Sequence, residues 1–417
     1  MPTRPCFVAV LLAAALAACS TTNSRTEFAA ADPRAAGFDP ERFERVDALV
    51  RSAVDEGRVA GASYLVLRDG RVAGQAAHGW ADLEERVPLR TDTIVRIYSM
   101  TKMVTAVAAL QLVEDGRLRL DDPITLQLPE LAELRVQTGG TLEAPELAPL
   151  ERPITVRHLL NHTAGFTYDI FGDTPVNEAY RRADLWSADT PEQFLAKVAR
   201  LPLLRQPGLA FDYSIADDVL GILVGRASGT SLEEHVAARI TGPLGLYDTA
   251  FDVPQVQRAR IAVLHERQEG RLARAATLLN VQPEPGRGFA SGGAGLFSTI
   301  GDYARFLQCL LQGGTLDGAR ILSRKMVELA LQDSLAPGLP GGPPTMGWGL
   351  IAALRRPEPA ASELGSPGMF WWGGAASTHF FVDPSERLVA LVFMQHFPYD
   401  SARIQGAFQN AVYQALE

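Results

Sequence analysis

A serine and a lysine three residues apart are the pair in this sequence that most clearly could carry out catalysis. Ser99 and Lys102 stand directly before a helical pattern of apolar residues, Met103 to Val113, so both side chains are expected on one face at the helix start. A serine hydroxyl becomes a nucleophile when a neighbouring base accepts its proton. Burial and the helix N-terminus both lower a lysine pKa, which would make Lys102 a neutral amine able to act as that base.

The scarcity of lysine makes this pair informative. The chain has only three lysines, Lys102, Lys197 and Lys325, so a Ser-x-x-Lys pattern would arise by chance in about one such sequence in eight. The alternative interpretation is an N-capping Ser99 followed by a solvent-facing Lys102.

A tyrosine motif and a tryptophan–glycine–glycine motif follow later in the chain. Alone, the tyrosine of Tyr213-Ser214-Ile215 would be interpreted as partly buried with a satisfied hydroxyl. Taken in order, Ser99-Met100-Thr101-Lys102, Tyr213-Ser214-Ile215 and Trp372-Gly373-Gly374 resemble the three motifs of the serine β-lactamases and D-alanyl-D-alanine peptidases. The closest pattern is that of the class C β-lactamases and their family VIII carboxylesterase relatives. Residues 154–165 and 290–299 resemble further segments of these proteins.

The resemblance implies a mechanism for these residues. Ser99 would attack an ester or lactam carbonyl, Lys102 with Tyr213 would handle the proton, and water would hydrolyse the acyl-enzyme. The backbone N–H groups of Ser99 and Ala375 would form the oxyanion hole, and no cofactor is required. Which of Lys102 and Tyr213 is the base stays open, because two coupled groups titrate as a pair.

Two departures from the class C pattern bear on the substrate. Ile215 stands where the second motif usually has asparagine, and Trp372 stands where the third usually has lysine; Ile215, Trp372, Gly373 and Gly374 are expected at the substrate. The missing cation removes a charge-assisted hydrogen bond to a substrate carboxylate, worth about 1.5–3 kcal/mol. The motifs therefore favour uncharged small-molecule esters.

Two alternatives stay open. One is a β-lactamase or D-alanyl-D-alanine peptidase acting on β-lactams or cell-wall peptides. The other is a non-catalytic lipoprotein that binds a cell-envelope partner, against which the presence of Ser99, Lys102 and Tyr213 argues.

Other chemical motifs are weaker. The chain has no Gly-x-Ser-x-Gly sequence, which excludes the common nucleophile elbow of the α/β-hydrolases. His158 and His162 are four residues apart, but no zinc motif surrounds them and no third ligand is evident, so no metal is predicted. Residues 286–288 and 291–293 lack the lysine of a phosphate-binding loop. Their glycines are expected to let the backbone lie close to other groups beside the site.

The N-terminus has the pattern of an export signal. An apolar run, Val8 to Ala18, follows Arg4 and is too short to span a bilayer. Its end, Leu16-Ala17-Ala18-Cys19, resembles the lipobox of bacterial lipoproteins; the alternative is an ordinary signal peptide. We expect a signal over residues 1–18, lipidation of Cys19 and a flexible tether over residues 19–36. The predicted location is the bacterial cell envelope, as a periplasmic lipoprotein attached to the outer membrane only through its lipid.

Composition excludes some functions. The formal charge is −9 and the arginines are scattered, so nucleic acid is not an expected partner. Cys309 lies in an apolar helical pattern and is expected to be a buried small side chain. Nothing in the sequence indicates an oligomeric state.

The distribution of patterns predicts an α+β fold. A hairpin is expected from strands at 62–68 and 71–79 around Asp69-Gly70, and further strands at 378–382 and 387–394. Helical periodicity dominates residues 99–310. We therefore expect one domain over residues 37–417 with the β-lactamase/transpeptidase-like design, an antiparallel sheet flanked by helices with a mostly helical inserted region.

Overall fold

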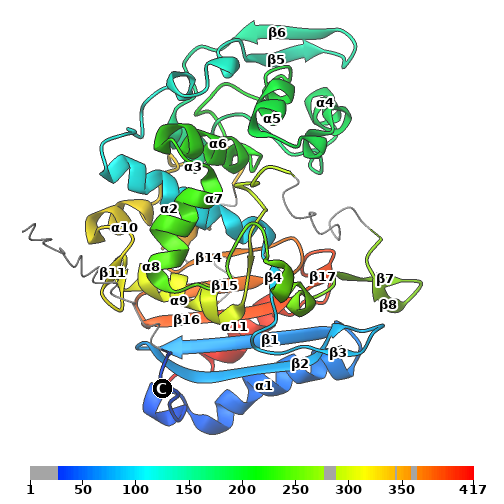
Figure 1. The fold of residues 1–417 in the computed structure, drawn as a ribbon, viewed down its shortest axis with the longest axis vertical. Coiled ribbons are helices and arrows are strands. Elements are labelled where there is room, and N and C mark those ends of the chain that lie inside the picture. Colours follow the sequence, from blue (N-terminus) through cyan, green and yellow to red (C-terminus); the bar gives the residue numbers. More distant parts are fainter. Residues whose placement is uncertain (1–26, 277–287, 343–344, 358–363) are drawn as a thin grey trace, which may run out of the picture.

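An eight-stranded antiparallel sheet forms the base of the molecule (Figure 1). The computed structural model describes residues 27–276, 288–342, 345–357 and 364–417. The strand order is β12-β13-β14-β15-β16-β1-β2-β3, so strands from both ends of the chain meet where β1 pairs with β16. The strands are β1 (Gly61–Arg68), β2 (Arg71–Asp82), β3 (Val87–Pro88), β12 (Met346–Trp348), β13 (Ala353–Arg355), β14 (Phe370–Gly373), β15 (His379–Asp383) and β16 (Leu388–Met394).

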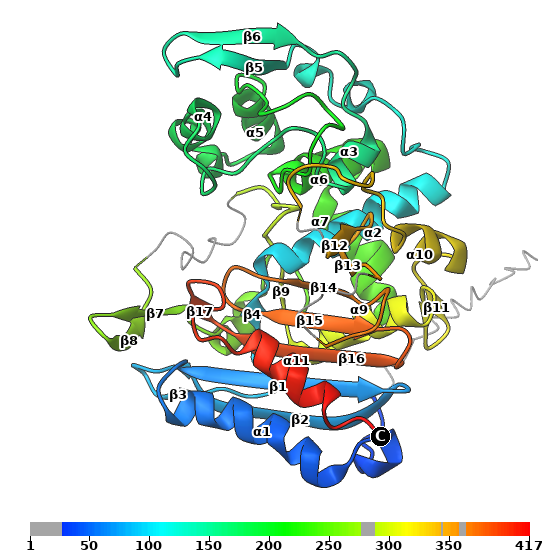
Figure 2. The same cartoon turned by 180° about the vertical axis from the view of Figure 1, so that it is seen from behind.

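Both faces of the central strands are apolar because helices cover each of them. Along β1, Tyr64 and Val66 pack with α1 (Pro40–Asp55) and α11 (Gln405–Tyr413). Leu65 and Leu67 point to the other face, where α9 (Ile300–Leu311) lies. Successive strand side chains point to opposite faces, so an unbroken apolar strand fits between two helical layers. Figure 2 shows α1 and α11 in front of the sheet.

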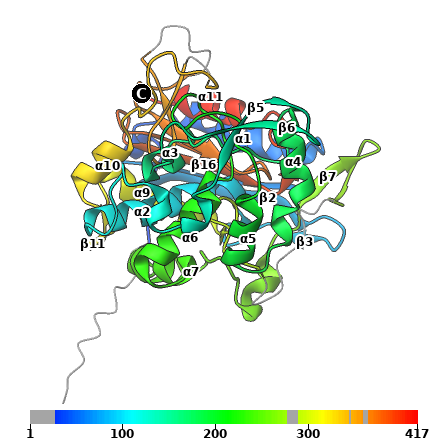
Figure 3. The same ribbon diagram turned by 90° about the horizontal axis from the view of Figure 1, so that it is seen from above.

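A helical region stands above the sheet (Figure 3). Its central helix, α2 (Thr101–Glu114), is mostly apolar and is buried from Thr101 to Leu112, as expected for a helix surrounded by protein. It packs against α6 (Ala216–Ser228). The other helices are α3 (Val156–Leu160), α4 (Pro175–Ala183), α5 (Pro191–Val198), α7 (Leu232–Val236), α8 (Gly242–Leu244) and α10 (Arg324–Ala330).

Short strand pairs complete the described fold. Two residues of β4 pair with β9, and this pairing lies next to the site described below. The bounds are β4 (Val95–Arg96) with β9 (Phe297–Ser298), β5 (Arg135–Gly140) with β6 (Pro145–Pro149), β7 (His265–Gln268) with β8 (Arg271–Arg274) and β17 (His396–Phe397), and β10 (Thr315–Leu316) with β11 (Ala319–Arg320). Within the described ranges, no helix is both long and apolar enough to span a membrane.

The predicted α+β class and both terminal strand pairs are confirmed, and one boundary is corrected. The tether expected over residues 19–36 ends earlier, because Ala30 bridges Val72 of β2 and the Ala31 N–H donates to the Val72 carbonyl at 2.9 Å. Ala36 is buried. The signal over residues 1–18 and Cys19 lie outside the described residues. The sequence analysis also overlooked β12, β13 and β14, which are too short to show a clear alternation.

Candidate active site

Ser99 lies in a 3-10 turn, Tyr98–Met100, that leads directly into α2. A hydrogen bond anchors the start of the turn: the Ile97 N–H donates to the Leu296 carbonyl at 3.0 Å, beside the β4–β9 pair. Tyr98 adopts a φ of 43°, an unfavourable left-handed conformation for a bulky residue. Such a conformation persists only where surrounding contacts impose it. The backbone at Ser99 is therefore sharply turned and anchored.

Lys102 is buried in the first turn of α2, with 2% of its surface exposed. Its Nζ lies 3.4 Å from Ser99 Oγ, 3.0 Å from the Tyr168 hydroxyl oxygen and 2.8 Å from the Gly293 carbonyl oxygen. An ammonium has three N–H donors, and these three oxygens can accept all of them. The contact between Ser99 and Lys102 agrees with the geometry that the motif spacing predicts.

The prediction of a lowered lysine pKa is wrong. Burial by itself lowers the pKa of Lys102, but neighbouring ionisable oxygens outweigh it and the net shift is upward. These oxygens belong to Tyr168, Tyr213, Asp217 and Asp218. Tyr213 was expected beside Lys102, whereas Tyr168 and the two aspartates of α6 were not. In this site Lys102 is an ammonium at neutral pH.

Tyr213 and Trp372 meet across the site from different elements. Trp372 lies on β14, and its indole Nε1–H donates to the Tyr213 hydroxyl oxygen at 3.2 Å. Lys102 Nζ lies 4.8 Å from the centre of the Tyr213 ring. The tryptophan therefore supplies a neutral hydrogen-bond donor to Tyr213 from the third motif, besides an apolar surface.

The turn after β14 places the other third-motif residues against the serine segment. A Cβ atom at Gly374 would lie 2.3 Å from the Ile97 carbonyl oxygen, so only glycine permits this approach. The turn closes by a hydrogen bond from the Ser377 N–H to the Gly374 carbonyl at 2.9 Å. Among the described residues, neither the Ser99 N–H nor the Ala375 N–H donates to another backbone group. Both remain candidate oxyanion-hole donors.

Ile215 does not have the position expected of it. Its side chain is fully buried in the core at the start of α6, so it offers no surface to a substrate. Gly373 is close to Tyr399, since a Cβ atom there would lie 2.7 Å from the Tyr399 hydroxyl oxygen. Of the four residues expected at the substrate, Trp372 and the Gly373-Gly374 backbone come to the site and Ile215 does not.

Sequence reasoning missed a group of buried polar residues behind Lys102. The Tyr168 hydroxyl oxygen, in the segment after α3, accepts a hydrogen bond from Lys102 Nζ at 3.0 Å. His162 Nε2 lies 3.3 Å from Asp217 Oδ2, and both side chains are almost fully enclosed. Burial, with Lys102 nearby, lowers the pKa of His162, so this ring is neutral. Tyr168 lies three residues past the segment 154–165 that the resemblance singled out, but no spacing in the sequence marks it.

The remaining histidine and cysteine predictions can also be placed. His158 caps α3, its Nδ1 accepting from the Thr155 N–H at 3.2 Å, and so does not face His162. In the ranges that the structure describes, no three His, Cys, Asp or Glu side chains form a metal-binding group. Cys309 is buried in α9, and burial raises the pKa of its thiol to about 12, which confirms it as a packing residue.

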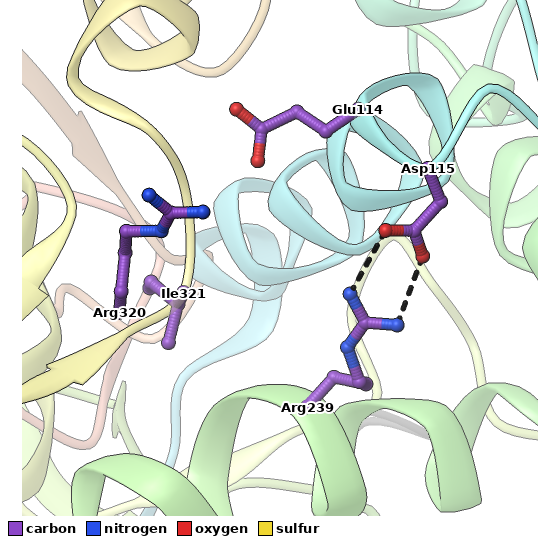
Figure 4. A pocket seen from close by; sticks show the side chains of 5 residues that line it. All are labelled: Glu114, Asp115, Arg239, Arg320 and Ile321. Carbon is purple, nitrogen blue, oxygen red and sulfur yellow. Dashed lines mark hydrogen bonds and ion pairs between the residues drawn. The ribbon is translucent and has the colours of Figure 1, made fainter.

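A separate pocket of about 350 Å³ lies at the far end of α2, away from Ser99 (Figure 4). Its walls carry Glu114, Asp115, Arg239, Arg320 and Ile321. Its walls carry no serine, cysteine or lysine, and Arg239 forms a partly exposed ion pair with Asp115. The hydrogen-bonded group around Lys102, rather than this pocket, is the candidate active site.

Comparison with known proteins decides the family. A family model described as Beta-lactamase matches residues 46–414. The chain belongs to the beta-lactamase family. It is 35% identical over 361 residues to Protein Rv1367c of Mycobacterium tuberculosis, covering 84% of this chain and 89% of that protein. It is 31% identical over 409 residues to Esterase EstB of Burkholderia gladioli, covering 91% and 99%.

Solved structures agree with this membership. The structure of EstCE1, described as a hydrolase with promiscuous acyltransferase activity, superposes with a TM-score of 0.77 at 26% identity, covering 89% of this chain and 99% of that one. The predicted β-lactamase-like fold and the resemblance to the serine β-lactamases and their esterase relatives are thereby confirmed. The chain is accordingly a serine hydrolase of this family.

Proposed function

We propose that this protein hydrolyses small uncharged carboxylic esters through an acyl-enzyme on Ser99. The observation that carries the proposal is the contact of Ser99 Oγ with a buried Lys102 Nζ, opposite a tryptophan in the third motif. Two relatives, Esterase EstB and the Lovastatin esterase of Penicillium rubens, are named as esterases, and the latter is 30% identical over 402 residues.

Proton transfer follows from the state of Lys102. Because the ammonium has no free electron pair, Tyr213 is the group that accepts the Ser99 proton as Oγ bonds to the ester carbonyl carbon. Tyr213 acts from its phenolate form, which the Lys102 charge and the Trp372 N–H stabilise, and it becomes a neutral phenol when it accepts the proton. Tyr213 then returns the proton to the departing alkoxide, and a water molecule hydrolyses the acyl-enzyme with Tyr213 again as base. The N–H groups of Ser99 and Ala375 stabilise the tetrahedral oxyanion.

The surroundings of the site favour apolar substrates. Phe171 and Trp186, each 44% exposed, have ring centres 5.9 Å and 6.3 Å from that of Tyr168. Trp372 is itself partly exposed, with its ring centre 5.1 Å from that of Tyr213. An aromatic surface binds acyl and aryl groups but offers no charge to a carboxylate.

A substrate comparison tests this function. We expect p-nitrophenyl acetate and butyrate to have a kcat/KM that exceeds that of a chromogenic cephalosporin by about ten- to a hundredfold or more. A fluorophosphonate probe should label the wild-type protein at Ser99. A cephalosporin that is the better substrate would replace the esterase proposal with a β-lactamase, and absence of labelling together with absence of turnover would favour the non-catalytic alternative.

The location of the protein is a second part of the proposal. We propose export as a lipoprotein anchored through Cys19, supported by the lipobox pattern of residues 16–19. In a Gram-negative host, Cys19→Ser should move the protein from the membrane to the soluble fraction while leaving esterase activity unchanged. Unchanged fractionation would contradict the lipid anchor.

A further inference from the structure

Asp218 is a buried carboxylate that faces the lysine from α6. It lies in the first turn of that helix and is completely buried. Its Oδ1 accepts two hydrogen bonds, from Ser291 Oγ at 2.5 Å and from the Gly293 N–H at 3.1 Å. Within the described residues, its Oδ2 has no hydrogen-bond partner.

The unpaired oxygen is directed at the lysine site. A Cβ atom built on Gly293 would lie 2.5 Å from Asp218 Oδ2 and 3.1 Å from the Tyr168 hydroxyl oxygen. Asp218 Oδ2 and the Tyr168 hydroxyl therefore flank Gly293, and this tyrosine is also a hydrogen-bond partner of Lys102. The absence of a side chain at position 293 is what allows the carboxylate to approach.

The segment that Asp218 holds carries one of the three acceptors of Lys102. The Gly293 carbonyl accepts from Lys102 Nζ at 2.8 Å, while the N–H of the same residue donates to Asp218. On the other side, Thr105 Oγ1 of α2 donates to the Gly292 carbonyl at 2.7 Å. The glycine segment is thus fixed between α2 and α6, and the position of the Gly293 carbonyl depends on Asp218.

We propose that Asp218 is a positioning residue for Lys102. Through Ser291 and Gly293 it fixes the carbonyl that orients the ammonium toward Ser99, and its negative charge stabilises that ammonium. The inference rests on the proposed function only in assuming that Ser99 and Lys102 carry the chemistry. Asp218 itself touches neither Ser99 nor Lys102 by a hydrogen bond, so its effect passes through the glycine segment and through its charge.

Several other groups face Lys102 and must be kept constant in a test. They are Ser99 in the turn before α2, His162 and Tyr168 in the segment after α3, Tyr213 before α6, and Asp217 in the first turn of α6. Asp217 is next to Asp218 in sequence but its carboxylate lies beside His162. A change confined to Asp218 therefore leaves these groups in place.

Two substitutions separate the roles of Asp218. Asp218→Asn retains the oxygen that accepts from Ser291 and Gly293 but removes the charge, whereas Asp218→Ala removes both. The matched control is Asp302→Asn, because Asp302 is also completely buried near a helix start and accepts from the Asp248 N–H at 2.8 Å and from Thr249 Oγ1 at 3.1 Å. The readouts are kcat and KM for p-nitrophenyl butyrate and the pH dependence of Ser99 labelling by a fluorophosphonate.

We expect Asp218→Asn to lower kcat about tenfold with KM nearly unchanged, and to move the alkaline decline of Ser99 labelling about one pH unit lower. The direction follows because removal of a negative charge lowers the pKa of Lys102. Asp218→Ala should lower kcat about a hundredfold, since the Gly293 carbonyl is no longer held. Asp302→Asn should change thermal stability but leave the pH dependence as in the wild type.

The outcomes distinguish this inference from the proposed function. A labelling profile of Asp218→Asn identical to that of the wild type, with kcat within about twofold, would overturn the positioning role. If wild-type protein is labelled at Ser99 but hydrolyses no ester, the proposed function fails while the labelling profile still decides the role of Asp218. If Asp218→Asn does not fold, Ser291→Ala removes one of the two contacts to Asp218 Oδ1, and an unchanged labelling rate in that variant would overturn the proposal.

Discussion

The two ends of helix α2 carry similar charged groups in very different surroundings. At its start, Lys102 is 2% exposed and surrounded by three oxygen acceptors. At its end, Asp115 pairs with Arg239 at 2.9 Å, with side chains 36% and 45% exposed (Figure 4). Water screens the second pair strongly and the first group hardly at all.

The difference shows that burial makes the N-terminal end of α2 suited to catalysis. The presence of charge or of open volume alone does not. The pocket at the far end is an open space of about 350 Å³, yet its ion pair contributes little because solvent competes for both partners. A charge held in a dry environment alters the ionisation of its neighbours, and this is the condition that proton transfer requires. The predictions below test this contrast, beginning with the largest effect.

Ser99→Ala should lower ester hydrolysis by about a thousandfold or more, because the other hydroxyl that the described residues place at Lys102 Nζ is the buried phenol of Tyr168, which does not replace an alkoxide nucleophile. The melting temperature should hardly change, since the Ser99 side chain does not cap α2. Steady-state kinetics and a thermal melt measure the two quantities. Activity above a few per cent of the wild type would remove Ser99 from its assigned role.

Lys102→Met should lower kcat by roughly a hundredfold to a thousandfold, because it keeps the length of the side chain but removes the ammonium. Lys102→Arg is a second test of the same site. Arginine keeps the charge, but its larger head does not fit between Tyr168 and Gly293, so a loss of similar size is expected. Near-normal turnover in Lys102→Met would mean that Tyr213 acts without a cation, and near-normal turnover in Lys102→Arg would mean that a guanidinium can take the place of the ammonium.

The pH dependence of the wild-type enzyme tests the charge of Lys102 directly. Since the pKa of Lys102 is raised, the ammonium persists through neutral pH and kcat/KM should not decline until the pH reaches the ordinary lysine value of about 10.4 or beyond. A neutral lysine base needs no charge on Lys102, so kcat/KM would then show no alkaline decline from the loss of the ammonium. A profile without that decline would restore the neutral amine as base.

Trp372→Phe should lower kcat about three- to tenfold, because it removes one hydrogen bond to Tyr213, worth about 0.5–1.5 kcal/mol. The control is Trp371→Phe. Trp371 is adjacent on β14 and packs both with the cluster beneath the sheet and with the cluster around Trp348, but the hydrogen bond to Tyr213 comes from Trp372. Kinetics with p-nitrophenyl butyrate measure both variants. Equal losses in the two would indicate a packing effect and not a contact with Tyr213.

Arg239→Ala should have the smallest effect, at most about 1 kcal/mol in the free energy of unfolding and no change in kcat. Chemical denaturation and ester kinetics measure these quantities. A loss of kcat in this variant would connect the two ends of α2 and contradict the contrast between them.

Local sequence patterns predicted those parts of the fold and site that depend on residues close together in the chain. Helical periodicity located α2, and the Asp69-Gly70 turn located the first hairpin. The motif spacing identified Ser99 and Lys102, whose contact follows from one turn of helix. Ile215 was misjudged because the motif gives a position in the chain and not the direction of the side chain.

Tertiary structure alone decided the electrostatics of the site. The sequence shows that Lys102 begins an apolar helix, from which burial and a lowered pKa follow. It does not show that Tyr168 and, on α6, Asp217 and Asp218 join Tyr213 around Lys102. These four residues together reverse the shift. Likewise, the sequence shows that residue 372 is a tryptophan. It does not show the hydrogen bond from Trp372 to Tyr213, which forms only because the fold brings their separate elements together. Residue type and short-range order are properties of the chain, whereas the ionisation of a buried group depends on the distances that packing sets between distant segments.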